Sequence, residues 1–486
     1  MDVHVSLVGR RDLAGETYRQ LRAAILDGRL RPGERLPPGR ELALRLNVSR
    51  TTVNVAYDRL ISEGFASARV GSGTFVTRHV TPAHASRVAS SASALRPRPV
   101  WDTIPLPTGL WRDTDFDLRP GIPDARLFPY ETWRRLIARQ FRPVAVGRGG
   151  YGDPEGHAGL REAIARHIGA SRAVRATAED IVVTNGTQQA VDIVARVLLA
   201  PGDRVAVEDP GYSTLRRLFT SLGARVSGVR VDAEGIVVDA IPPGTRLVYV
   251  SPSHQFPLGM SMSLSRRMAL LAWAERHDAA IVEDDYDSEF RFDGRPIEPL
   301  QTLDPSGRVI YVGSFSKSLL APLRVGFIVA PASLQRATRA AKFVTDWHTS
   351  LPTQAALARF IDQGLFARHI RRMRPVYRAR HEAIIAGVAE ILGDDLEVIP
   401  SSVGLHLAAL ARSANVEQVA AILRRASTAG VASLALGTMA VDEPPRAGVV
   451  LGYGAITADE IPEALRRLRR AFDAELRPAR RALSRR

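Results

Sequence analysis

The 486-residue sequence has no cysteine and no apolar run long enough to cross a bilayer. The missing cysteine excludes disulfide frameworks and thiolate metal sites, and it agrees with a reducing compartment. A transmembrane helix, which needs about 18–20 consecutive apolar residues, is also excluded. The first ten residues lack the apolar core of a secretory signal. We therefore expect a cytoplasmic protein with no membrane partner and no metal site.

Lysine is almost absent as well. Lys317 and Lys342 are the only lysines among 66 basic residues, and the net charge is +15. This charge favours a polyanion such as nucleic acid, although a general preference for arginine explains it equally well. Arginine carries a permanently protonated, delocalised guanidinium and cannot form a Schiff base. A lysine that persists in such a sequence is therefore a candidate for amine chemistry.

The N-terminal part has the pattern of a winged helix-turn-helix. Apolar residues recur at helical spacing in three segments, over residues 13–27, 39–46 and 49–63. Ser49 suits the N-cap of the third helix and Gly64 its stop. A β-prone hairpin around Gly71-Ser-Gly73 follows. We assign residues 1–78 to this domain and the Ser-, Pro- and Arg-rich stretch 79–115 to a linker.

Polar residues gather at the start of the third helix, in the place where a helix-turn-helix enters the major groove. These residues are Ser49, Arg50, Thr51, Thr52 and Asn54. Arginine can bond a guanine edge, and hydroxyls at a helix start can hold phosphate. A polar first turn that only caps the helix is the competing interpretation.

The same region resembles the GntR family of bacterial regulators. The matching motifs are Gly33-Glu-Arg-Leu-Pro37, Arg40-Glu-Leu-Ala43, Val48-Ser-Arg-Thr51, Leu60, Glu63-Gly64 and Gly71-Ser-Gly-Thr-Phe-Val76. By this resemblance Arg40, Arg50, Thr52 and Asn54 contact a double-stranded DNA operator. Gly73 would let the wing approach the minor groove.

Beyond residue 116, short apolar strands alternate with helices, which is typical of an α/β domain with a mostly parallel sheet. The expected strands are Ile181–Thr184, Arg204–Val207, Arg225–Val229, Leu247–Val250, Ala279–Val282, Val309–Val312 and Val325–Ala330. We assign 116–486 to this body, with a large part over about 145–370 and a small part over about 371–486. An amphipathic, arginine-rich helix is expected over 465–486.

Four segments at strand ends suggest a cofactor site, because α/β sheets bind ligands at the carboxyl ends of their strands. Gly186 and Thr187 open a helix whose N–H groups could hold an anion, although many such turns are only turns. Tyr212 could stack on a planar ring or simply pack. The acids of 283–287 fit a cationic ring nitrogen or, less well, a metal ion.

The fourth segment contains Lys317 between hydroxyl residues. Lysine just after a strand, with Ser314 before it and Arg324 after it, suits a Schiff base beside a phosphate. An exposed loop lysine is the alternative.

Together these segments resemble fold-type I pyridoxal-phosphate enzymes, the aspartate aminotransferase superfamily. The fused chain more closely resembles the MocR/GabR subfamily of GntR-type regulators. The further motifs are Tyr151-Gly-Asp-Pro154, Thr187-Gln-Gln-Ala190, Glu208-Asp-Pro-Gly-Tyr212, Pro252-Ser-His-Gln-Phe-Pro257, Glu283-Asp-Asp-Tyr-Asp-Ser-Glu-Phe290 and Phe366-Ala-Arg-His369.

The resemblance implies pyridoxal 5'-phosphate as the cofactor. Lys317 would form the Schiff base, and Asp284 would pair with the pyridinium nitrogen. Tyr286 would bond the ring hydroxyl and Tyr212 would stack on the ring. The implied phosphate-binding residues are Gly186, Thr187, Ser314 and Arg324. In the homodimer that such bodies form, Tyr151 would reach the phosphate of the neighbouring subunit.

Two departures separate this sequence from ordinary aminotransferases. Phe256-Pro257 stands in place of an Asn-Pro pair, so His254 or Gln255 must support the ring hydroxyl or the contact is lost. The run Val450-Leu-Gly-Tyr453 lacks the arginine that usually grips a substrate carboxylate, and Arg446 lies off register.

Three functions are compatible with these features. The first is a transcription regulator that senses pyridoxal phosphate or a small amine through an aldimine at Lys317. The second is a working aminotransferase with a DNA-binding appendage, which the missing arginine disfavours. The third is a DNA-binding protein whose body only dimerises, which the lysine, acid and phosphate-binding set disfavours. The first is the hypothesis that we carry forward.

Overall fold

The chain divides into two compact units, Met1–Arg98 and Pro99–Arg486, which are described separately. A computed structural model describes residues 12–77, 96–106, 113–147, 149–294 and 298–483, the last seven by their backbone alone. Much of the stretch that we expect to be a linker lies outside the described residues, but Pro99–Thr103 forms a 3-10 helix, η1. Within the described ranges, no helix is both long enough and apolar enough to cross a membrane.

The first unit is a three-helix domain with a two-stranded wing. Its elements are α1 Leu13–Leu26, α2 Gly39–Leu46, α3 Arg50–Ser62, β1 Ala66–Arg69 and β2 Gly73–Val76. Asp12 caps α1, and Asn47 ends α2 in the left-handed region at φ +52°. The Ser49 hydroxyl accepts from the Thr52 N–H at 3.1 Å, so Ser49 is the N-cap that the sequence predicts.

A separate hydrophobic core holds this unit together. The buried side chains come from all three helices and both strands, and include Leu21, Leu42, Val53, Leu60 and Val76. Because Leu36 N donates to Thr74 O at 2.8 Å, the segment before α2 also lies along the wing. The predicted winged helix is therefore confirmed.

The second unit is built on a sheet in the order β4-β11-β10-β9-β8-β5-β6-β7. The strands are β4 Ile181–Thr184, β5 Arg204–Asp209, β6 Arg225–Asp232, β7 Gly235–Ile236, β8 Thr245–Val250, β9 Ala280–Asp285, β10 Val309–Ser314 and β11 Gly326–Val329. The central strands run parallel, while β11 and β7 are antiparallel to their neighbours. All seven predicted strands are present. β5, β6, β8, β9 and β10 extend further than expected, and β11 is one residue shorter at each end.

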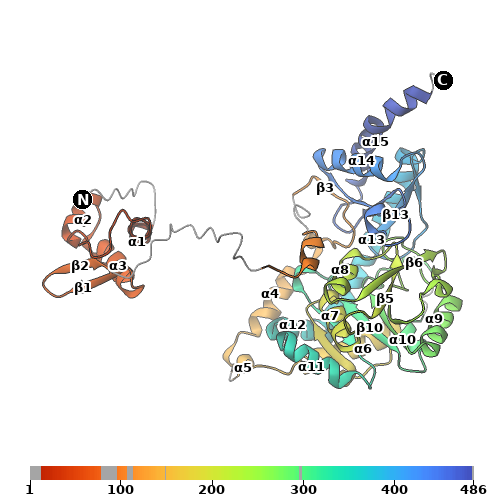
Figure 1. The fold of residues 1–486 in the computed structure, drawn as a ribbon, viewed down its shortest axis with the longest axis horizontal. Coiled ribbons are helices and arrows are strands. Elements are labelled where there is room, and N and C mark those ends of the chain that lie inside the picture. The colour runs from red at the N-terminus through yellow and green to blue at the C-terminus, as the bar shows by residue number, and fades with distance from the viewer. Residues whose placement is uncertain (1–11, 78–95, 107–112, 148, 295–297, 484–486) are drawn as a thin grey trace. The chain divides into compact units, whose positions relative to one another are not determined.

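Helices cover both faces of this sheet (Figure 1). Their bounds are α4 Tyr130–Arg139, α5 Pro143–Val146, α6 Ala158–Arg172, α7 Thr187–Leu198, α8 Ser213–Ser221, α9 Leu264–Arg276, α10 Leu300–Leu303, α11 Gln335–Asp346 and α12 Leu351–Asp362. Alternate side chains of β5 show why both faces are buried. Val205 and Val207 pack with α7 and α8, whereas Ala206 packs with α9.

A smaller sheet, in the order β12-β13-β16-β15, forms the C-terminal part of this unit. Its strands are β12 Leu396–Val398, β13 His406–Ala411, β15 Leu434–Ala435 and β16 Gly448–Gly452, and its helices are α13 Leu365–Leu392, α14 Val416–Thr428 and α15 Ile461–Leu483. The predicted tail helix therefore begins four residues early, and Leu465, Leu468 and Phe472 bury its apolar face. The short strands β3 Phe116–Asp117 and β14 Val431–Ala432 pair in parallel.

We predict that the two units unfold at separate temperatures, and that Leu60→Ala lowers the unfolding temperature of the first unit alone. Leu60 is fully buried in the core of the first unit alone, so its truncation should destabilise that unit by about 2–5 kcal/mol. Differential scanning calorimetry of the full chain should show one transition lowered and the other unchanged. The matched control, Leu270→Ala in the second unit, should lower the other transition. A single shared transition that moves in both variants would contradict independent cores.

Candidate functional site

The predicted cofactor residues lie where strands of the large sheet end. Gly186 follows β4, Tyr212 follows β5, Asp284 is the penultimate residue of β9 and Lys317 follows β10. Parallel strands present their carboxyl ends at one edge, so residues distant in sequence come together there.

Lys317 supplies an amine at this edge of the sheet. Its Nζ donates to the carbonyl of Gly121 at 2.7 Å. Gly121 has φ +75°, where other residues are strained, and an added Cβ would lie 2.7 Å from Nζ, so a larger residue would have to displace the lysine amine. Burial lowers the pKa of Lys317, although Asp287 and Asp284 oppose the shift. The unprotonated amine, which is the nucleophilic form, is therefore easier to reach here than in water.

Asp284 is buried and has one unused oxygen. The Tyr249 hydroxyl donates to its Oδ2 at 2.5 Å. Its Oδ1 is buried and finds no hydrogen-bond partner among the described residues. Burial raises the pKa of this carboxyl to about 7. A cationic N–H placed at Oδ1 would satisfy this oxygen and favour the ionised form.

The neighbouring acids have other partners, which explains how four acids tolerate one segment. Glu283 accepts from the N–H groups of Leu300 and Gln301, each at 3.0 Å. Asp285 bonds Arg172 at 2.8 Å, and Asp287 bonds His254 at 2.9 Å. The sequence showed the acids but none of these partners.

Donors converge at the start of α7. Gly186 caps this helix with φ +79°, and a Cβ there would lie 2.6 Å from a guanidinium nitrogen of Arg324. Arg324 itself is left-handed, at φ +50°, and donates to the carbonyl of Asn185 at 2.9 Å. A helix N-terminus beside a guanidinium suits a phosphate. Thr187 is the first residue of α7.

Two serine hydroxyls, those of Ser314 and Ser316, are further candidates for contact with the phosphate. Ser314 accepts from the Ser316 N–H at 3.1 Å, while the Ser316 hydroxyl is buried and has no partner in the described part of the chain. Ser316, which sequence reasoning passed over, is therefore a further candidate for the phosphate.

The predicted aromatic residues fall into two groups. Tyr212 packs edge-to-face on Phe256, with ring centroids 5.7 Å apart, and Tyr286 donates to the carbonyl of His254 at 2.8 Å. Tyr151 instead stacks on Trp347 at 4.7 Å and is 80% exposed, so it does not cover Lys317 within one subunit.

In the first unit, the start of α3 presents the predicted DNA-contacting side chains. Arg50, Thr51 and Asn54 are exposed, and Arg40 is exposed on α2. Ser49 and Thr52 also serve the cap, with their hydroxyls 2.8 Å apart. On the wing, Gly73 has φ +108°, and an added Cβ would lie 2.8 Å from Arg35 Nε, so glycine is required.

Comparison with known proteins agrees with both units. Residues 13–76 match the family described as bacterial regulatory proteins, gntR family, and residues 125–468 match aminotransferase class I and II. The probable rhizopine catabolism regulatory protein MocR of Rhizobium meliloti is 40% identical, over 94% of this chain and 93% of that protein. The chain belongs to the MocR/GabR subfamily of GntR-type regulators.

Two further matches support this MocR/GabR assignment. The pyridoxine biosynthesis regulator PdxR of Corynebacterium glutamicum is 32% identical over 91% of this chain and 92% of its own. The crystal structure of a Pyrococcus horikoshii kynurenine aminotransferase in complex with PMP has a TM-score of 0.70 at 28% identity, covering 81% of this chain and 99% of that one.

The MocR/GabR regulator uses pyridoxal phosphate, and its site fits that group. The unpartnered Asp284 Oδ1 suits the ring nitrogen, the donors at α7 suit the phosphate, and the Lys317 amine suits the aldehyde carbon. When bound, the cofactor supplies an electrophilic aldehyde and an electron-withdrawing ring.

The two candidates for supporting the ring hydroxyl differ in this regulator. Gln255 Nε2 already donates to the carbonyls of Pro210, at 2.9 Å, and Phe256, at 2.8 Å. His254 keeps a buried Nε2 without a partner among the described side chains and backbone. Of the two, His254 has the capacity for another bond.

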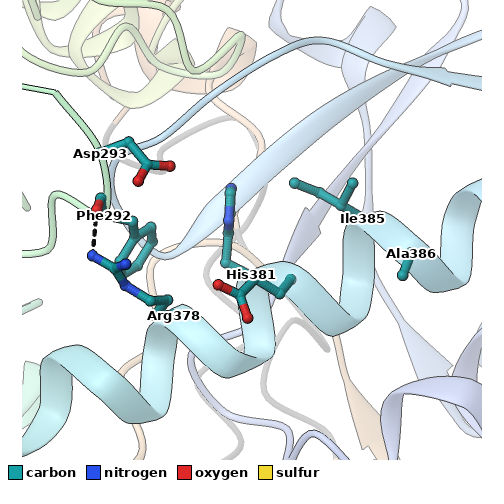
Figure 2. Close-up of a pocket in the computed structure, with 7 residues that line it drawn as sticks. Phe292, Asp293, Arg378, His381, Ile385 and Ala386 are labelled. Atoms are coloured by element: carbon teal, nitrogen blue, oxygen red, sulfur yellow. Dashed lines mark hydrogen bonds between the residues drawn. The ribbon is translucent and has the colours of Figure 1, made fainter.

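A surface pocket of about 350 Å³ lies elsewhere on this unit, beside α13 (Figure 2). It is lined by Phe292, Asp293, Arg378, His381, Glu382, Ile385 and Ala386. Arg378 donates across it to the carbonyl of Phe292. None of the predicted cofactor residues lines this pocket.

We predict that Asp284→Asn stabilises the cofactor-free regulator at about pH 8 by roughly 1–3 kcal/mol. Because the folded-state pKa is raised, the unfolded chain releases this proton first, and stability falls as pH rises from about 4 to about 7. Asparagine has no proton to release, so the gain should vanish near pH 4. Urea unfolding at both pH values measures it.

The control is Asp285→Asn, which removes a partner of buried Arg172. Burial opposes ionisation of Asp285, but Arg172 outweighs it and holds the pKa of this carboxyl below its ordinary value. This variant should lose about 3–5 kcal/mol at about pH 8. Equal destabilisation by both substitutions would contradict the unpaired role of Asp284.

Proposed function

We propose that this regulator senses pyridoxal phosphate, or a small amine that reacts with it, through Lys317 and thereby changes its affinity for a DNA operator. The observation that carries the proposal is the half-buried Lys317 amine, with its lowered pKa, and its electrostatic interaction with Asp284, whose Oδ1 has no partner among the described residues. In this proposal Gly186, Thr187, Ser314 and Arg324 hold the phosphate. Tyr286 meets the ring hydroxyl, and Tyr212 stacks on the ring.

Amine sensing is an exchange at Lys317. When bound, pyridoxal phosphate would supply an aldehyde carbon that either Lys317 Nζ or an incoming primary amine can bond. Lys317 would hold this carbon until an amine replaces it, and Nζ would take up the proton that the amine gives up. The exchange needs no oxidant and no net water. A lysine that easily adopts its neutral amine form can both form and release the bond to the aldehyde carbon.

Turnover as an aminotransferase is the second candidate, and the small sheet disfavours it. Val450, in place of the expected arginine, is buried in an apolar cluster with Leu258, Leu436 and Met439. Arg446 is exposed in the preceding loop. An α-amino acid would therefore lack the usual partner for its carboxylate.

The names of the relatives support regulation of amine or vitamin metabolism. PdxR is named for pyridoxine biosynthesis and MocR for rhizopine catabolism. We extend to this chain only the class of effector, an aldehyde vitamer or an amine, and we place the protein in the cytoplasm, where its operator is.

A homodimer is part of the proposal. Exposed apolar side chains gather on α5, on α11 and on the segments that follow them, among them Val144, Val146, Tyr151, Val344 and Trp347. Such side chains in a soluble body favour a protein interface. Tyr151 would then serve the neighbouring subunit's phosphate, and two winged helices would read paired half-sites.

We predict that Lys317→Arg abolishes the cofactor response. Wild-type protein treated with pyridoxal phosphate and then borohydride should gain a mass adduct at Lys317, and its operator affinity should change by about 5–150-fold with the cofactor. Arginine keeps the charge but cannot form the bond, so the variant should show neither change. Lys342 is the internal control, because its buried amine is paired with Asp346 and should gain no adduct in the wild type. An adduct elsewhere, or a response in the variant, would contradict the proposal.

For DNA recognition, we predict that Arg50→Ala weakens operator binding by about 1–3 kcal/mol, or about 5–150-fold. Arg50 is exposed at the start of α3. Arg59→Ala, at the far end of the same helix and paired with Glu63, should change affinity by less than about three-fold. Fluorescence anisotropy with a labelled operator measures both. Equal losses would place the DNA on another surface.

A further inference from the structure

Two buried imidazoles meet where the loops of the large sheet face the small sheet. His254 follows β8 and His406 begins β13. Their ring centroids are 4.6 Å apart, and each residue is 1% exposed. The Phe256 ring lies 5.2 Å from His406, and the Tyr286 ring lies 5.7 Å from His254. The histidines therefore have an aromatic ring on either side.

Each imidazole has one nitrogen committed and one unused. The Asp287 carboxylate lies 2.9 and 3.0 Å from His254 Nδ1, so we assign a proton to that nitrogen. The Pro257 carbonyl accepts a hydrogen bond from the His406 ring. Both Nε2 atoms are buried and meet no partner within the described ranges. Buried polar atoms of this kind require a partner that the polypeptide does not supply.

The unused nitrogens specify what that partner must do. Burial lowers the pKa of His406 well below its ordinary value, so the ring is neutral and its Nε2 is an acceptor. His254 Nε2 accepts when its ring is neutral and donates when it is protonated. A hydroxyl group can donate to His406 Nε2, and it can also accept from His254 Nε2 when that ring is protonated. With a neutral His254 ring, the hydroxyl satisfies His406 alone. A carboxylate cannot donate to His406, and a methyl group does neither.

The pair lies close to Lys317 through a short series of contacts. His406 is opposite Gly452 in the register of β13 and β16. A Cβ at Gly452 would be 2.6 Å from the carbonyl carbon of Arg119. Two residues later, Gly121 accepts the bond from Lys317 Nζ. The positive charge of Lys317 also lowers the pKa of His406.

The side chains of His254, His406, Phe256 and Val450 are together called the wall. Arg119, which the contacts above reach, does not offer its guanidinium to a carboxylate. Arg119 is held by Asp117, with nitrogen–oxygen distances of 2.7 and 2.5 Å. Val450, two residues before Gly452 and on the same face of β16, is apolar and buried. The wall therefore combines apolar surface with two hydrogen-bonding nitrogens.

We propose that His254 and His406 form an effector subsite that binds a hydroxyl group of a primary amine lacking a carboxylate. This inference rests on the proposed amine exchange at Lys317 and names the class of effector. His406 accepts from the hydroxyl, and Asp287 holds the His254 ring in position.

The test uses cofactor-loaded, full-length protein and three probes of similar size: 3-amino-1-propanol, n-butylamine and β-alanine. Binding is followed by the visible absorbance of the cofactor and, separately, by operator affinity. We expect the amino alcohol to bind about ten-fold or more tightly than the other two, because each of them leaves a buried nitrogen unsatisfied. His406→Phe, which keeps an aromatic ring beside Phe256, should reduce the preference to less than about two-fold.

Controls separate the possible failures. His277→Phe, a histidine stacked on Trp273 away from this wall, should keep the preference. Borohydride fixation at Lys317 in His406→Phe shows that the variant retains a folded cofactor site. A second substitution, His406→Gln, keeps a hydrogen-bonding side chain and should restore part of the preference.

Equal affinities for the amino alcohol and butylamine, with the absorbance response retained, would contradict the hydroxyl subsite but not the amine-sensing function. The two unused nitrogens would then be assigned to an ordered water. Zinc binding that the wild type shows and His406→Phe loses would also overturn the hydroxyl subsite. No absorbance or operator response to any amine would contradict the amine-sensing function, and the subsite with it.

Discussion

The constraint around which the second unit is organised is the partial burial of one amine, Lys317, together with a buried carboxyl, Asp284, that keeps an unsatisfied oxygen. Removing Lys317 from water favours its neutral form, and removing Asp284 from water favours its protonated form. Without the cofactor, this arrangement stabilises the charged form of neither group. A cofactor that bonds the amine and presents a cationic ring nitrogen satisfies both at once, so the fold is complementary to the bound state rather than to the empty one.

The surroundings maintain that arrangement by giving the neighbouring acids partners of their own. Arg172 and Tyr311 hold Asp285, His254 holds Asp287, and Tyr249 leaves Asp284 with a single unused oxygen. Cofactor binding can change the affinity for DNA only if the cofactor or effector binds two states of the protein with different affinity. The loops that carry His254 and the strand that carries His406 belong to different sheets, so a ligand that joins them would distinguish such states.

Much of this organisation could be predicted from the sequence. The helices of the first unit and the seven strands follow from apolar periodicity and turn residues, and Lys317 stands out because the chain otherwise uses arginine. The partners of the acids could not be predicted, because Tyr249 and Arg172 lie on elements 35 and 113 residues away from the acids that they contact. Only the pairing of strands determines which side chains meet. The antiparallel direction of β11 could not be predicted for the same reason. Ser316 was missed because its candidacy depends on a hydroxyl that is left without a partner among the described residues.

The most direct test of the central claim is a crystal structure of the full-length protein grown with pyridoxal phosphate. We predict continuous electron density between Lys317 Nζ and the cofactor, with Asp284 Oδ1 within about 2.6–3.0 Å of the ring nitrogen. Cofactor bound elsewhere, or a ring nitrogen that faces away from Asp284, would contradict the account.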